Sequence, residues 1–123
     1  GRDEIYHIML ANPGLYQNGI FMDTFFAKQG RYEFRFVSSG ESPQKLSLIL
    51  KGKSFSFDED YVLVSTEHGD FGKYYTWKYL GRERIEIPED QNLEIIINPN
   101  GELVGSVSVY LKNEIGVTPS AEP

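Results

Sequence analysis

The stretch that decides the fold class is Arg31–Val37, which has the sequence Arg-Tyr-Glu-Phe-Arg-Phe-Val. Aromatic residues occupy every second position and charged residues the positions between, which is the period of a strand with one buried face. The same alternation recurs at residues 45–50, 61–66, 73–79, 83–87, 93–98 and 106–112. Segments 5–10 and 20–27 are also apolar enough for strands, although Asp23 and Thr24 interrupt the second and leave a short helix as an alternative.

The segments between these strands have turn composition. Gly and Pro at 39–43 and 98–101 supply positive φ and a fixed φ, as turns require, and residues 68–70 and 80–82 suit hairpin ends. Eight or nine short strands without a long helical window predict an all-β fold, an antiparallel two-sheet β-sandwich of jelly-roll type. We expect one domain over residues 1–113 and a Pro- and Ser-containing tail or linker over 114–123, a composition that fits one part of a larger protein.

Composition excludes several classes of function. The net charge is −6 and the pI about 4.9, which disfavours nucleic acid, because a phosphate backbone needs a basic surface. No apolar run approaches the about 20 residues of a membrane-spanning helix, so we expect no membrane insertion. The chain has no cysteine, which excludes disulfides and cysteine-ligated metals but does not fix the compartment; an extracellular or cell-surface location is the one we favour.

Catalytic signatures are missing from the sequence. His7 and His68 are the two histidines, and no nucleophile elbow, zinc-protease helix, phosphate-binding loop or dinucleotide fingerprint accompanies them. A hydrolase built on a pair of carboxylates is the weakest of the alternatives we keep. We predict a protein without enzymatic activity.

Acidic residues cluster at Asp58-Glu59-Asp60, where we expect a turn, and again at Glu67, His68 and Asp70. Calcium prefers several oxygen ligands from one loop, and alternate residues point to one side of an extended chain. Asp58 and Asp60 are therefore the candidate Ca²⁺ ligands, although a solvated acidic turn is the favoured interpretation.

Strand 73–79 carries the strongest functional signal. Its Tyr75, Trp77 and Tyr79 share one face and would form a ladder of rings about 6.5–7 Å apart, on which sugar rings stack. Tyr74 and Lys78 complete the candidate ligand-binding set. The alternative is that the three rings belong to the core, opposite the aromatic residues of 31–37, which would leave Tyr74, Lys78 and Tyr110 on the solvent face.

The first strand, 5–10, is separated from the rest by the breaker Asn12-Pro13-Gly14. It either completes its own sheet, which we favour, or adds to the edge of a neighbouring copy and builds an oligomer or fibre.

Residues 30–36, with 93–98 and 107–111, resemble the Gly-X-Tyr strand and closing strands of jelly-roll interaction domains, such as carbohydrate-binding modules and the GOLD domains of trafficking proteins. The resemblance covers residues 20–112 as a strand rhythm, and the cysteine pair common in GOLD proteins is absent. It implies a non-catalytic binding or assembly role. We predict a binding module with a glycan as leading ligand. The alternative is a structural or assembly subunit, with a protein partner or further copies of itself, joined by edge-strand or N-terminal-strand pairing.

Overall fold

The computed structural model describes residues 4–10, 16–69, 71–101 and 107–114, which form strands, turns and loops and contain no helix. The predicted strands are confirmed, and their bounds are β1 (Glu4–Met9), β2 (Tyr16–Gln17), β3 (Ile20–Ala27), β4 (Gly30–Val37), β5 (Lys45–Lys51), β6 (Ser56–His68), β7 (Tyr74–Leu80), β8 (Arg84–Ile87), β9 (Gln91–Asn98) and β10 (Ser108–Asn113). Nine of these strands have four residues or more, and β2 is a two-residue addition. No helix in the described part of the chain is long and apolar enough to cross a membrane.

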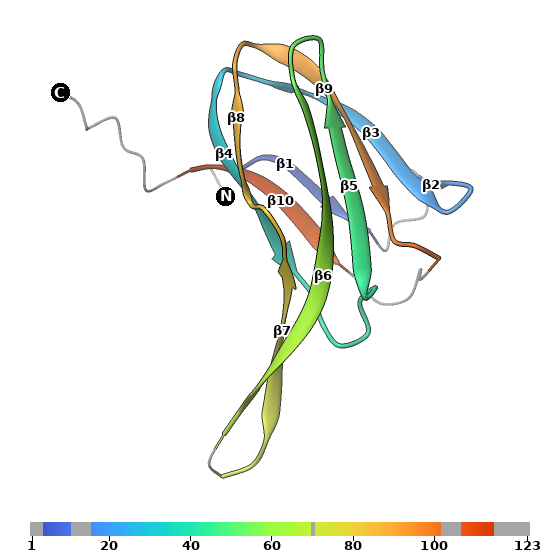
Figure 1. Cartoon of the computed structure of the whole chain (residues 1–123), viewed down its shortest axis with the longest axis vertical. Helices are drawn as coiled ribbons and strands as arrows, with labels where there is room; N and C mark the ends of the chain where they lie inside the picture. The colour runs from blue at the N-terminus through green and yellow to red at the C-terminus, as the bar shows by residue number, and fades with distance from the viewer. Residues whose placement is uncertain (1–3, 11–15, 70, 102–106, 115–123) are drawn as a thin grey trace, which may run out of the picture.

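The strands form two antiparallel sheets that face each other, as Figure 1 shows. Sheet A has the order β1-β10-β4-β8, and sheet B has the order β2-β3-β9-β5-β6-β7. From β3 onward the chain passes repeatedly between the sheets, whereas β5, β6 and β7 follow one another within sheet B. The fold is therefore the predicted antiparallel β-sandwich, jelly-roll-like in its exchange of strands between layers.

Alternation along each strand produces the core. Sheet B contributes the leucines of β5 and the apolar alternate residues of β9, and sheet A contributes Tyr32 and Phe34 of β4. Aromatic rings then meet across the layers: Phe34 lies 5.8 Å from Phe57, and Phe36 lies 4.7 Å from Tyr61 (centroid distances). The rings opposite β4 thus come largely from β6, which sequence reasoning did not anticipate.

Residues 20–27 form strand β3, as their apolar character indicated, and the helix alternative is wrong. Thr24 faces solvent, and Asp23 lies on the inner face, where it accepts a hydrogen bond from the Tyr6 hydroxyl. Two other local expectations change in the structure. The acidic run 58–60 lies near the start of β6 and not in a turn. Residues 80–82 are not a hairpin end but the start of the crossover from β7 in sheet B to β8 in sheet A.

The first strand completes its own sheet. β1 pairs antiparallel with β10 from Glu4 to Met9. Tyr6 fixes it to the opposite sheet, since its ring stacks on Phe25 at 4.4 Å and its hydroxyl donates a 2.8 Å hydrogen bond to Asp23. In this arrangement β1 forms these contacts within its own chain.

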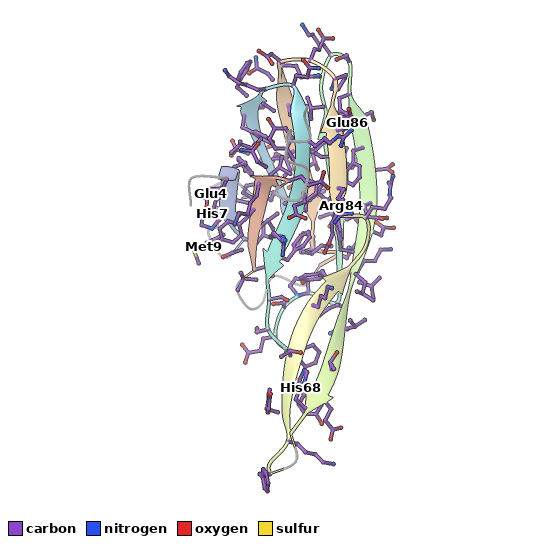
Figure 2. All side chains as sticks on the ribbon, turned by 90° about the vertical axis from the view of Figure 1, so that its left-hand side faces the viewer. Glu4, His7, Met9, His68, Arg84 and Glu86 are labelled. Carbon is purple, nitrogen blue, oxygen red and sulfur yellow. The ribbon has the colours of Figure 1, made fainter. Side chains whose placement is uncertain are left out.

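The β6–β7 hairpin extends far beyond the sandwich (Figures 1 and 2). Pairing of β6 with β5 ends at Val62, and beyond Leu63 the described residues of β6 pair with β7 alone. We call the projecting part, Val64–His68 paired with Tyr74–Lys78, the arm. Five residues at about 3.4 Å each make it about 17 Å long.

Candidate functional site

The aromatic row of β7 runs from solvent into the core. Tyr75 is 53% exposed, Trp77 is half-buried and Tyr79 is 1% exposed. Tyr79 is a core residue: its hydroxyl donates a 2.6 Å hydrogen bond to the carbonyl of Pro43, and its ring lies 5.4 Å from Phe36. The three rings share a face as predicted, but they do not form a continuous ladder on the surface.

Trp77 lies at the boundary between arm and sandwich. A Cβ added at Gly40 would come within 3.0 Å of the indole, so the ring packs directly on the glycine backbone. The hydroxyl of Ser38 donates a hydrogen bond of 3.3 Å to the Trp77 carbonyl. The β4–β5 loop thus supports one side of the ring and fixes its position.

A cleft of about 460 Å³ opens beside Trp77, between the end of β4 and the edge strand β7. It is lined by Glu33, Arg35, Phe36, Thr76, Trp77, Lys78, Tyr79, Glu83 and Arg84. The cleft lies where the edge strand β7 continues past β4 into the arm (Figure 1). Residues distant in the sequence therefore meet around one indole ring.

Charged groups of both signs line the cleft. Arg35 donates two hydrogen bonds to a single oxygen of Glu33, at 2.8 and 3.2 Å, and these bonds raise the pKa of the Arg35 guanidinium. Arg84 is the cross-strand partner of Glu33 on β8 and forms a 2.8 Å ion pair with Glu114. The cleft therefore offers fixed donors and acceptors next to an aromatic ring.

Tyr74 is directed to the opposite face of β7 from Trp77. Its ring stacks on His68 at a centroid distance of 5.1 Å, and His68 Nε2 lies 2.8 Å from Thr76 Oγ1. Tyr74 thus does not share a site with Trp77. Lys78 lies on the same face of β7 as Tyr74. Because β7 is an edge strand, the Lys78 side chain nevertheless lines the cleft beside Trp77.

The candidate calcium ligands lie elsewhere, on the outer face of sheet B. Asp58 and Asp60 border a depression of about 290 Å³. Asp60 Oδ2 lies 3.6 Å from Lys45 Nζ, and the Arg82 guanidinium donates to the Asp58 carbonyl. The described residues contain no group of three or more His, Cys, Asp or Glu side chains placed to hold a metal ion. The Asp58 and Asp60 site gains no third ligand from this arrangement, and Asp70 of the second acidic segment lies outside the described residues.

Glu59, between these two aspartates, joins β6 to the crossover. Its carboxylate accepts a 2.7 Å hydrogen bond from the Arg82 backbone N–H and a 3.2 Å bond from Arg82 Nε. The backbone bond is the main reason that the pKa of Glu59 is lowered. Glu59 therefore joins β6 to the segment that crosses from sheet B to sheet A.

The two histidines lie apart. His7, in sheet A, stacks on Tyr110 with 4.2 Å between ring centroids, and its Nδ1 is 3.9 Å from Glu4. His68 lies near the far end of the arm (Figure 2). Neither ring faces a carboxylate within hydrogen-bonding distance among the residues described, so the geometry assembles no acid–base pair around an imidazole.

Sequence reasoning missed most of the cleft. Arg35, Glu83 and Arg84 belong to segments whose spatial neighbours are set by pairing between strands distant in the chain. It also missed Phe71, which is 101% exposed beyond the strands of the arm. A single phenylalanine in the glycine-containing segment 69–72 is a signal that could have identified this exposed position.

Comparison of the chain with protein-family models, curated proteins and solved structures finds no match.

Proposed function

We propose that this protein is a non-catalytic binding module and that the cleft beside Trp77 recognises a glycan. The observation that carries the proposal is the combination of an indole ring with ionic groups of both signs around one cleft. A pyranose has an apolar face that packs on an aromatic ring and hydroxyl groups that both donate and accept hydrogen bonds.

The fixed geometry of the cleft supports the same proposal. Trp77 is supported by Gly40, and Arg35 is oriented by Glu33. Groups held in place before binding lose little conformational entropy when a ligand arrives. Tyr75, the next exposed ring on the same face, extends the aromatic surface along the arm beyond the cleft.

Tryptophan fluorescence tests the proposal directly, since Trp77 is the single tryptophan of the chain. We expect titration with a panel of soluble oligosaccharides to shift and saturate the emission for at least one sugar class. Lys78→Ala should weaken that binding about tenfold, because a hydrogen bond from a charged group is worth about 1.5–3 kcal/mol.

Tyr74→Ala is the matched control, because Tyr74 lies on the same strand but on the opposite face from Trp77. It should leave the affinity unchanged, whereas Tyr75→Ala should reduce it. An emission spectrum that responds to no sugar in the panel, or equal losses in the Tyr74 and Tyr75 variants, would contradict a glycan site at this cleft.

A further inference from the structure

Glu33 is a buried acid in the wall of the cleft, and one of its two carboxylate oxygens is open. The residue is 8% exposed, which is low for a glutamate. Both hydrogen bonds from Arg35 go to Oε1, at 2.8 and 3.2 Å. Oε2 accepts a hydrogen bond from none of the residues that the structure describes. Glu33 thus lines the cleft with an acceptor to which no described side chain donates.

An open, buried acceptor favours a ligand that supplies the donor. A buried polar group without a hydrogen-bond partner is unfavourable, and more so when it is charged. An ionised carboxylate accepts hydrogen bonds and donates none, so the group that satisfies Oε2 must carry an O–H or an N–H. The hydroxyl groups of a sugar are such donors, and an oxygen with two lone pairs can accept from two of them.

The remaining charges of the cleft favour an uncharged ligand. Arg84 is already paired with Glu114 at 2.8 Å. Lys78 and Glu83 also line the cleft, and they take part in none of the ion pairs formed among the described residues. A carboxylate on the sugar would gain Lys78 but meet Glu83, and an ammonium group would do the reverse. Burial of either charge is costly without a full counter-charge.

We propose that the glycan of this cleft is uncharged and that Glu33 selects it by accepting hydrogen bonds from its hydroxyl groups at Oε2. This inference rests on the proposed glycan function and names the class of sugar. Trp77 and Glu33 line the same cleft, so one pyranose can stack on the indole while hydroxyls at its rim donate to the carboxylate. Arg35 holds the carboxylate in place, so the acceptor is oriented before the sugar binds.

The first test compares ligands on the unmodified chain, with the emission of the single tryptophan as the signal. Three oligosaccharides of the same linkage are titrated: a neutral one, one that carries uronate groups and one that carries amino groups. We expect the neutral sugar to bind at least about tenfold more tightly than either charged one. Among its deoxy analogues, loss of the hydroxyl that donates to Oε2 should weaken binding about tenfold, as expected for a hydrogen bond to a charged group.

The second test changes the acceptor. Glu33→Gln keeps an oxygen for Arg35 and replaces the open oxygen with an amide NH₂, which is a donor. It should weaken binding of the neutral sugar about tenfold, and it should bind the critical deoxy analogue as the unmodified chain does. Glu86→Gln is the matched control. Glu86 is an exposed acid of β8 that does not line the cleft, and Figure 2 shows it farther from the arm than Arg84, so this variant should keep the full affinity.

The outcomes separate this inference from the proposed function. If no sugar of any charge changes the Trp77 emission, both are wrong. If a charged sugar binds more tightly than the neutral one, or if Glu33→Gln binds the neutral sugar like the unmodified chain, the glycan site stands and the role of Glu33 is wrong. Circular dichroism checks that Glu33→Gln is folded; if it is not, the neutral, charged and deoxy sugars decide the question on the unmodified chain.

Discussion

The two halves of the β6–β7 hairpin have the same strand alternation but opposite environments. In the sandwich half, Tyr61 is fully buried and Tyr79 almost so. In the arm, Ser65 and Tyr75 lie on the same face and are exposed. The difference is the facing layer. β4 and the loop that follows it lie against the hairpin as far as Trp77, and the rest of the arm projects beyond the facing sheet (Figure 1).

This comparison shows what alternation encodes. A period of two assigns each residue to one face of its sheet, but a residue is buried only where a second layer lies opposite that face. The hairpin continues past that layer, so its aromatic residues change from core to surface within four residues of β7. The candidate functional surfaces lie at and beyond this transition.

The largest expected effect contrasts two tyrosines of this one hairpin. Tyr61→Ala should lower the free energy of unfolding by about 3–5 kcal/mol, the cost of removing a buried aromatic side chain and leaving a cavity. Tyr75→Ala, on the arm, should change it by less than about 0.5 kcal/mol. Urea denaturation followed by circular dichroism measures both. Similar losses in the two variants would mean that the arm is packed in solution.

Tyr79→Phe tests the sandwich half more finely. It keeps the ring and removes the hydroxyl that donates to the buried Pro43 carbonyl. We expect a loss of about 1–3 kcal/mol in unfolding free energy, the cost of leaving a buried acceptor without its donor. The matched substitution Tyr75→Phe should be neutral. If Tyr79→Phe and Tyr75→Phe changed the unfolding free energy equally, the Tyr79 hydroxyl would be in contact with water.

Gly40→Ala tests the boundary between the two halves. The added methyl group would meet the Trp77 indole at less than 3.0 Å, so the ring must move outward. We expect a cost of about 1 kcal/mol, at the low end for overpacking because a half-buried ring can shift. The Trp77 emission should move to longer wavelength as the ring becomes more exposed. An unchanged spectrum would show that the indole does not rest on the loop.

The smallest effect concerns acid. The folded-state pKa of Glu59 is lowered, chiefly by the hydrogen bond from the Arg82 N–H. The ionised Glu59 carboxylate therefore stabilises the fold above its ordinary pKa, and this stabilisation is lost as the pH falls through the folded-state pKa. The unmodified chain should therefore lose stability from about pH 5 downward, and Glu59→Gln should show a shallower loss. Urea titrations at a series of pH values measure this difference. If the unmodified chain and Glu59→Gln lost stability in parallel as the pH falls, the ionised Glu59 carboxylate would not stabilise the fold.

Much of the fold could be predicted from the sequence because it rests on local alternation. The Arg31–Val37 pattern locates β4 and its buried face, and Leu46, Leu48 and Leu50 locate the core face of β5. Pairing between distant strands has no such local signature. The crossover at Gly81 therefore resembled a hairpin end, and the acidic residues at 58–60 resembled a turn although Phe57 and Tyr61 on either side of them belong to the core.

The candidate site could be predicted only in part, for the same reason. The shared face of Tyr75, Trp77 and Tyr79 follows from their spacing, whereas their graded exposure depends on where the pairing of β5 with β6 ends. Arg35 and Glu83 join Trp77 through the arrangement of both sheets.

Amide hydrogen exchange on the unmodified chain tests the central claim most directly. We predict that the amides of the arm exchange through local opening, with a free energy well below that of the amides in β5 and β9, which exchange only on global unfolding. Arm amides as strongly protected as those of β9 would contradict the account, because they would show that the hairpin remains covered along its whole length.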